Sequence, residues 1–249
     1  LFGWLLSLFG LSRVAVIGGM AILTMHRLTV EPVAYASART DLKAGLGILL
    51  AVCGAARDWW RPGPILLMAG GALIAWLSKE TAVVLLFLLP LTWWVQARRR
   101  PAPPTAIGYA LLAVWLTGLT VAMVALRDRS ATQYVNIGEL LGGFVAWPEW
   151  LAIQSAAAIR LIGAVILPLP LTVDYDYDLI PTAFRWLSVA ALATIGFVAI
   201  WQHQRRPLIA YGAIWTLVAL LPRLIVQTPR GYLNEHQFYV PFLGCVIVL

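Results

Sequence analysis

The chain has 249 residues, of which 61% are hydrophobic and only 12% are charged, and its mean hydropathy is +0.83. Soluble globular domains are nearer half apolar and a quarter charged. A soluble core of this size cannot bury so much apolar surface, so we expect an all-α, polytopic membrane protein. A soluble enzyme, a nucleic-acid-binding domain and a disordered tail are excluded. The net charge of +7 is therefore interpreted as a signal of membrane topology, with no nucleic-acid partner.

Apolar runs between the charged residues predict the helices. The first run, residues 1–10, is too short to span a bilayer and is interpreted as the tail of a helix. The runs that follow are residues 14–25, 42–56, 64–77, 82–95, 107–126, 186–201, 208–221 and 238–249. We expect about eight spans or partial spans in a single transmembrane domain, residues 1–249, which is taken as a fragment truncated at both ends.

The basic residues predict an orientation. Arg13, the 57–61 loop, the 98–100 run and the pair 205–206 together hold eight basic residues and one acidic residue. The opposite face then holds ten of each, so the whole net charge lies in short loops on one side. The positive-inside rule places these loops in the cytoplasm, which leaves ten of the eleven acids on the outer face.

One apolar stretch is expected not to cross the membrane. The run 107–126 leads outward, and the run 186–201 must lead back inward to reach Arg205. The stretch 150–171 is therefore interpreted as a re-entrant or interfacial segment within an outer loop region of residues 127–185. If it crossed, Arg205 would lie outside, against the charge bias. The stretch contains four residues typical of such a segment: Gln154, Arg160, Pro168 and Pro170.

The strongest local pattern lies in residues 26–42, a loop between two apolar runs. Ionisable groups at a membrane surface next to a cavity indicate a functional site. The alternative is structural, in which Glu31 pairs with Arg39 while Thr40 or Asp41 caps the following helix. The residues alone leave both alternatives open. The ionisable members of the loop that carry the functional interpretation are His26, Glu31, Arg39 and Asp41.

This loop resembles the pattern HPxxxEAVAxxxxRADLL of the transmembrane, tetratricopeptide-bearing O-mannosyltransferases and their bacterial relatives, within the GT-C glycosyltransferases. Arg27 stands where that family has proline. Three further segments resemble family motifs in the family's order: residues 77–80 (LxKE), 168–175 (PxxLxxDY) and 234–244 (AERxxYLPSxG). In the last of these, His236 replaces the usual arginine. The matching residues of the first loop are His26, Glu31, Ala34, Arg39, Asp41 and Leu42.

The resemblance implies a membrane glycosyltransferase of GT-C type. It would transfer a sugar, mannose by resemblance, from a polyprenyl-phosphate donor to a hydroxyl of a protein or glycan. The expected location is a bacterial inner membrane, with the active face periplasmic or extracytoplasmic. The departing phosphate needs fixed cations, for which the candidates are Arg39, Lys79, Arg230 and His236. The residues expected to orient the sugar or the acceptor are His26, Glu31, Asp41, Glu80, Glu235 and Tyr239.

The catalytic base is expected upstream of Leu1, in the first outer loop of the family, so the catalytic residue of this chain is unknown. The chain alone is accordingly expected to be inactive. No cofactor is assigned. The alternating acids Asp174, Asp176 and Asp178 are weak candidates for a divalent metal site, and a solvated loop is the favoured alternative.

Two other functional classes remain open. The first is a transporter or flippase for a lipid-linked substrate, which would carry ionisable residues near the middle of its helices. The second is a glycan ligase or polymerase of related architecture, which the sequence does not separate from a transferase. All three interpretations make membrane lipid and a lipid-linked substrate the partners of the chain.

Overall fold

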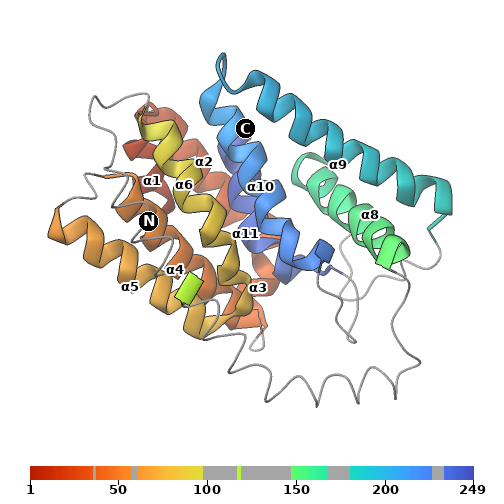
Figure 1. The fold of residues 1–249 in the computed structure, drawn as a ribbon, viewed down its shortest axis with the longest axis horizontal. Coiled ribbons are helices and arrows are strands. Elements are labelled where there is room, and N and C mark those ends of the chain that lie inside the picture. The colour runs from red at the N-terminus through yellow and green to blue at the C-terminus, as the bar shows by residue number, and fades with distance from the viewer. Residues whose placement is uncertain (36–37, 58–60, 98–116, 119–146, 168–179, 226–232) are drawn as a thin grey trace.

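The structure, a computed structural model, describes residues 1–35, 38–57, 61–97, 117–118, 147–167, 180–225 and 233–249. Every regular element in these ranges is helical, which confirms the all-α expectation (Figure 1). The elements, with η for short 3-10 helices, are α1 (Phe2–Leu8), α2 (Arg13–Met25), η1 (Arg27–Thr29), α3 (Val30–Ala34), α4 (Arg39–Ala55), α5 (Pro62–Ser78), η3 (Glu80–Val84), α6 (Leu85–Ala97), α8 (Trp147–Ile166), α9 (Thr182–Gln202), α10 (Pro207–Ile225), η5 (Glu235–Phe238) and α11 (Tyr239–Val248).

Local sequence signals explain several helix boundaries. Gly10 adopts a positive φ of 71° between α1 and α2, a conformation in which a side chain would be strained. Ser12 caps α2, because its Oγ accepts a hydrogen bond from the Ala15 amide at 3.3 Å. Pro62 opens α5, where its missing amide hydrogen costs nothing. The expected run 82–95 is divided in the structure between η3 and α6.

The closest helix packing is between α4 and α5, and glycine makes it possible. A β-carbon added to Gly47 would lie 2.6 Å from the Gly71 carbonyl oxygen, and one added to Gly54 would lie 2.7 Å from the Pro64 oxygen. The backbones of the two antiparallel helices are therefore in direct contact. This is the packing expected of membrane helices, where small residues let backbones approach and maximise van der Waals contact.

Helix α10 lies between the other helices, and its large aromatic residues fill the core (Figure 1). Tyr211 and Trp215 are fully buried, and the Phe9 ring lies 4.9 Å from the Tyr211 ring. Both polar groups are satisfied: the Tyr211 hydroxyl is 2.8 Å from Thr92 Oγ1, and Trp215 Nε1 donates to the Val240 oxygen at 2.9 Å. These bonds fix α6 and α11 against α10.

Helices α10 and α11 form a second close, antiparallel pair. A β-carbon on Gly212 would lie 2.7 Å from the Gly244 oxygen, and Thr216 Oγ1 donates to the Pro241 oxygen at 3.2 Å. Residues later in α10 thus meet residues earlier in α11. The small side chains again set the distance between the helices.

Helix α2 is also antiparallel to α11. A β-carbon on Gly19 would contact Leu6 of α1 at 2.8 Å and Val246 at 3.7 Å. At the other end of α2, the His26 ring lies 4.8 Å from the Phe242 ring. Helices α1 and α2 therefore pack together, and α2 packs against α11.

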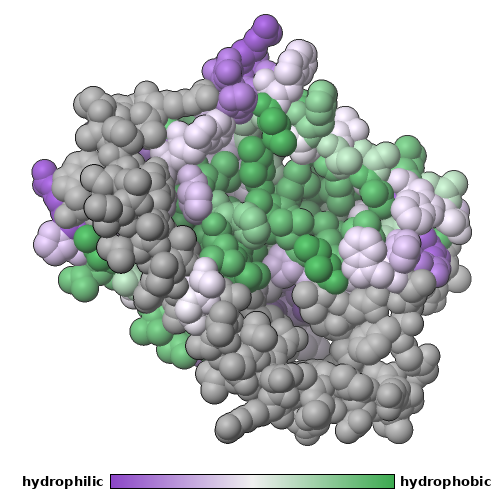
Figure 2. All heavy atoms as spheres, in the orientation of Figure 1, coloured by the Kyte–Doolittle hydropathy of each residue, from purple (hydrophilic) through white to green (hydrophobic). Residues whose placement is uncertain are grey.

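The ionisable residues of these helices gather at two ends of the bundle. Tyr239, the first residue of α11, packs on Gly45 near the start of α4, so α4 and α11 begin at the same end. We call this the site end and the opposite one, where α10 begins, the basic end. Figure 2 shows hydrophilic side chains over the α9–α10 turn and a largely apolar face below it. The described arginines at or next to the basic end are Arg13, Arg57, Arg61, Arg205 and Arg206.

Three of the described helices, α8, α9 and α10, are long and apolar enough to cross a membrane. A fourth span results if α2 and the segment that follows it, bent by 60°, are counted as one. The other apolar helices, including α5, are shorter. These helices are consistent with a membrane protein, whereas the eight spans expected from the sequence stay a prediction. The run 107–126 lies almost wholly outside the described residues.

Helix α8 contains most of the stretch expected not to cross. Glu149 near its start accepts a hydrogen bond from Arg185 of α9 at 3.2 Å, and the Leu167 oxygen just beyond its end accepts one from Arg27 at 3.3 Å. Arg27 and the start of α9 both belong to the site end. The segment therefore begins and ends against the same end of the bundle, as a re-entrant or interfacial helix would. Its non-crossing path in a membrane stays a prediction.

The neighbouring glycines Gly70 and Gly71 provide a matched test of the α4–α5 contact. Gly71→Ala should destabilise the protein by about 1–3 kcal/mol, because the new methyl group would meet the α4 backbone, 2.7 Å from the Gly47 oxygen. A β-carbon added to Gly70 would have no atom within 4 Å. Gly70→Ala should therefore stabilise the protein by up to about 1 kcal/mol, because alanine has the higher helix propensity. Thermal unfolding in detergent measures both variants, and equal melting temperatures would contradict the proposed contact.

Candidate functional site

A buried ion pair joins two of the segments selected by the sequence. Lys79 Nζ lies 2.5 Å from Asp41 Oδ1, and the two side chains are only 13% and 6% exposed. Asp41 lies in the first turn of α4, and Lys79 follows the last residue of α5. The pair therefore connects the first loop motif with the segment 77–80.

The backbone around each partner favours this geometry. Lys79 is extended, with φ −162° and ψ 146°, so α5 ends there and the side chain turns towards the start of α4. The partial positive charge of the α4 N-terminus stabilises a carboxylate in its first turn. The contact between the α4 and α5 backbones holds the end of α5 beside the start of α4, where the two partners meet.

One of the two oxygens of the Asp41 carboxylate receives no hydrogen bond from the described residues. That oxygen, Oδ2, is buried. Leaving a buried acceptor unsatisfied costs about 1–3 kcal/mol, so buried polar atoms in proteins are nearly always paired. An orphaned oxygen beside a fixed ammonium group is a position at which a ligand hydroxyl or a water molecule would be held.

The structure tests only the capping part of the structural alternative, because the side chain of Glu31, the expected partner of Arg39, is not described. Ala38 is the residue that precedes α4, with no side-chain cap, so neither Thr40 nor Asp41 caps the helix. Asp41 pairs with Lys79 and not with Arg39. Arg39 is exposed, and within the described part of the chain no side chain pairs with its guanidinium group. It is therefore an accessible cation next to the buried pair.

The segment 234–244 reaches the same end of the bundle. The ring of Tyr239 packs on Gly45, since a β-carbon there would lie 2.6 Å from the ring. Gly45 is one helical turn beyond Asp41 and on the same face of α4. Helix η5, which carries buried Glu235 and partly buried His236, contacts α3 and η1. Its start is stabilised by a capping box between Asn234 and Gln237.

His26 joins the first loop to α8 and α11. Its Nδ1 accepts from the Leu28 amide at 3.2 Å, and its ring lies 4.8 Å from Phe242. Burial lowers the pKa of His26 below its usual 6.5, and the neighbouring Arg27 lowers it further, whereas a hydrogen bond with the Val165 backbone opposes both. At neutral pH the His26 ring is therefore uncharged, and its contacts connect the first loop to α8 and α11. His26 lies outside the three helices that are long enough to cross a membrane.

Several candidate residues fall outside the described part of the chain. Glu31 lies in α3 and Glu80 in η3, but the positions of their side chains are not described. The metal candidates and one phosphate candidate are wholly outside: Asp174, Asp176, Asp178 and Arg230. Among the residues that are described, no group of three or more His, Cys, Asp or Glu side chains is placed to hold a metal ion.

The sequence singled out Gln154 only as a polar residue in an apolar stretch, but the structure gives it a specific role. It is fully buried in α8, and its Oε1 accepts from the Leu233 amide at 3.0 Å, just before η5. Its Nε2 has no partner among the described residues. Gln154 thus fixes the start of the segment 234–244 against α8, while its own Nε2 is one of several buried polar atoms without a partner among the described residues.

Neither cysteine forms a disulfide. Cys53 and Cys245 are both free and buried, as packed apolar residues are. Both lie in helices that pack through small residues, where a thiol fits closely.

No family model matches the chain, and no curated protein or solved structure matches it. The resemblance to the O-mannosyltransferases therefore rests on its four sequence motifs. Of these, the structure brings together three, residues 26–42, 77–80 and 234–244, at the site end; the fourth, 168–175, lies outside the described residues.

The ion pair predicts a coupled loss of stability. Lys79→Met should destabilise the protein by about 3–5 kcal/mol, because it leaves a buried carboxylate without its cation. Adding Asp41→Asn should recover part of that loss, since no buried charge then remains. Denaturant unfolding of the two single variants and the double variant measures the coupling. Lys43→Met, which removes an exposed lysine of α4, is the control and should change little.

Additive effects of the two substitutions would contradict an interaction between Asp41 and Lys79. If Lys43→Met lowered the stability as much as Lys79→Met, the effect would come from removing any lysine at this end and not from the ion pair.

Proposed function

We propose that the chain is the membrane core of a GT-C-type glycosyltransferase. It would transfer a sugar, mannose by resemblance, from a polyprenyl-phosphate donor to a hydroxyl of a protein or glycan. The observation that carries the proposal is the assembly, at one end of the bundle, of three motif segments around the buried Asp41–Lys79 pair with its orphaned carboxylate oxygen.

The residues divide between two tasks. Asp41 Oδ2 is an acceptor for a sugar or acceptor hydroxyl, and Lys79 is the cation that holds this carboxylate in place. Because Lys79 is engaged by Asp41, the donor phosphate would rest chiefly on Arg39, which is exposed and available. An arginine suits that task, since its guanidinium group matches two phosphate oxygens.

The distribution of charge favours an enzyme over a transporter. In α4, α5, α6, α9, α10 and α11, every Asp, Glu, Lys, Arg or His lies within about the first or last turn or two, whereas the middle of each helix contains none. Transporters place such groups near the midplane of the membrane, where substrate passes. Arg160 in α8 is the exception among the described helices.

The orientation follows from the same distribution. The arginines of the basic end would face the cytoplasm under the positive-inside rule. The site end would then face the periplasm of a bacterial inner membrane, where a lipid-linked sugar and an exported acceptor meet. The donor's lipid would lie among the helices and its phosphate at the membrane surface.

Arg39 and Lys43 allow a charge-matched test of this proposal. Both are exposed cations in the first two turns of α4. Arg39→Gln should lower sugar transfer by about 10²-fold or more, because charge that develops on the leaving phosphate loses its stabilisation. Lys43→Gln should retain transfer within about twofold. The assay measures transfer from a labelled polyprenyl-phosphate mannose in membranes that contain the complete protein.

Equal and nearly full transfer by both variants would contradict the phosphate role of Arg39. Absence of transfer by the unmodified complete protein, together with movement of the labelled donor across vesicle membranes, would favour a flippase instead.

A further inference from the structure

An apolar groove lies between α9 and α10, at the end of the bundle opposite to the site. Its volume is about 600 Å³, within the range of about 300–1,000 Å³ typical of small-molecule sites. Val198 and Ala199 of α9 and Ala210 and Ala213 of α10 form much of its lining. The groove exists because short side chains face each other here: Ala199 and Ala210 are buried and leave the space that larger residues would fill.

Two arginines line the same groove at the turn between the helices. Arg205 and Arg206 are exposed, and no acidic residue is among the groove's lining residues. Their backbone amides both donate to the Gln202 oxygen, at 3.0 and 2.9 Å, which fixes the two positions next to each other. Neither guanidinium group bonds to a side chain in the part of the chain that the structure describes.

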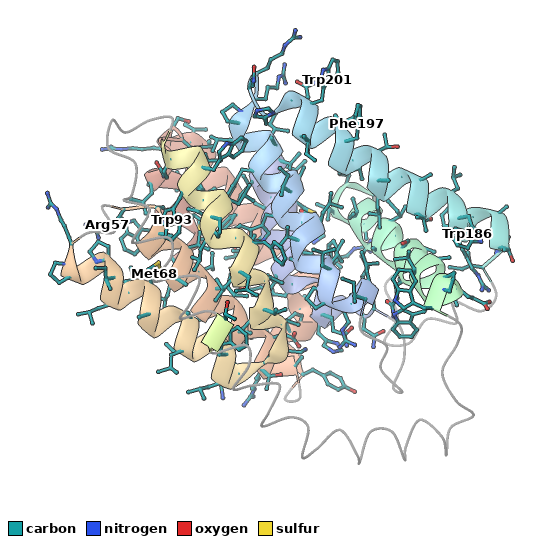
Figure 3. All side chains as sticks on the ribbon, viewed as in Figure 1. Arg57, Met68, Trp93, Trp186, Phe197 and Trp201 are labelled. Carbon is teal, nitrogen blue, oxygen red and sulfur yellow. The ribbon has the colours of Figure 1, made fainter. Side chains whose placement is uncertain are left out.

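The surroundings of the groove are those of a lipid-facing surface. Phe197 and Trp201 project from α9 away from the bundle (Figure 3) and are 69% and 67% exposed. Val198 and Ile209, which line the groove, are also exposed. A bound molecule must therefore combine a long apolar part, for the wall, with an anionic group for the arginines. A small soluble anion could contact the arginines but would leave the apolar wall of the groove uncovered.

We propose that the α9–α10 groove binds one anionic phospholipid, with an acyl chain along Val198, Ala199 and Ala213 and the phosphate against Arg205 and Arg206. Basic pockets between membrane helices bind lipid head groups in this way, and arginine pairs with phosphate through two parallel hydrogen bonds. The absence of acids from the lining favours an anionic over a zwitterionic lipid, because a choline or ethanolamine group would meet only positive charge.

Native mass spectrometry of the complete protein in detergent tests this proposal, with phosphatidylglycerol and phosphatidylcholine of identical acyl chains as probes. The unmodified protein should retain one phosphatidylglycerol and prefer it by about 30-fold, or about 2 kcal/mol, because each arginine near a membrane surface contributes about 1 kcal/mol. Arg205→Gln/Arg206→Gln should reduce this preference to near parity. Ala213→Trp, which fills the groove, should weaken the binding of both lipids.

The matched control is Arg13→Gln/Arg61→Gln, which removes the same charge from the same end of the bundle but away from the groove. It should retain the preference for phosphatidylglycerol. Equal binding of the two lipids by the unmodified protein, or the same loss in both double variants, would overturn the proposal. So would displacement of the lipid by millimolar inorganic phosphate, or a dimer without lipid, which would assign the surface to a second copy of the chain.

Discussion

The backbone contact between α4 and α5 is the constraint on which the candidate site depends. Gly47, Gly54 and Gly71 have no side chains to separate the two helices, so their relative register is fixed by van der Waals contact along their length. With this register, the end of α5 lies beside the start of α4, and Lys79 meets Asp41. A buried ion pair is costly unless its geometry is held, and the glycine contact supplies that geometry.

The apolar middle of the bundle separates two ends with different chemistry. The site end combines a paired carboxylate, the exposed Arg39 and the η5 segment, whereas the basic end carries several arginines. Lipid cannot solvate charge, so a membrane helix keeps its ionisable residues near its ends unless function requires otherwise. The proposed enzyme and the proposed phospholipid site use these two ends separately.

Helix α8 connects the parts of the site end. Its contacts run from Arg185 at the start of α9, through Leu233 before η5, to Arg27 in the first loop. It therefore fixes three distant parts of the chain relative to one another. A helix in this position would shape the opening of the site, and the Gln154 side chain within it accepts a hydrogen bond from the Leu233 backbone amide.

Composition and charge pattern alone determined the all-helical membrane class, the approximate helix boundaries and the division of ionisable residues between two ends, because apolar length and the cost of charge in lipid act locally along the chain. The sequence also predicted that four motif segments, residues 26–42, 77–80, 168–175 and 234–244, lie on the same face, and the structure describes three of them at one end of the bundle. Only the tertiary structure decided that Asp41 pairs with Lys79 while Arg39 is exposed, that Gly71 packs closely while Gly70 does not, and that a groove lies between α9 and α10 at Arg205. These facts depend on helix register and side-chain volume across elements far apart in the chain, which no local pattern contains.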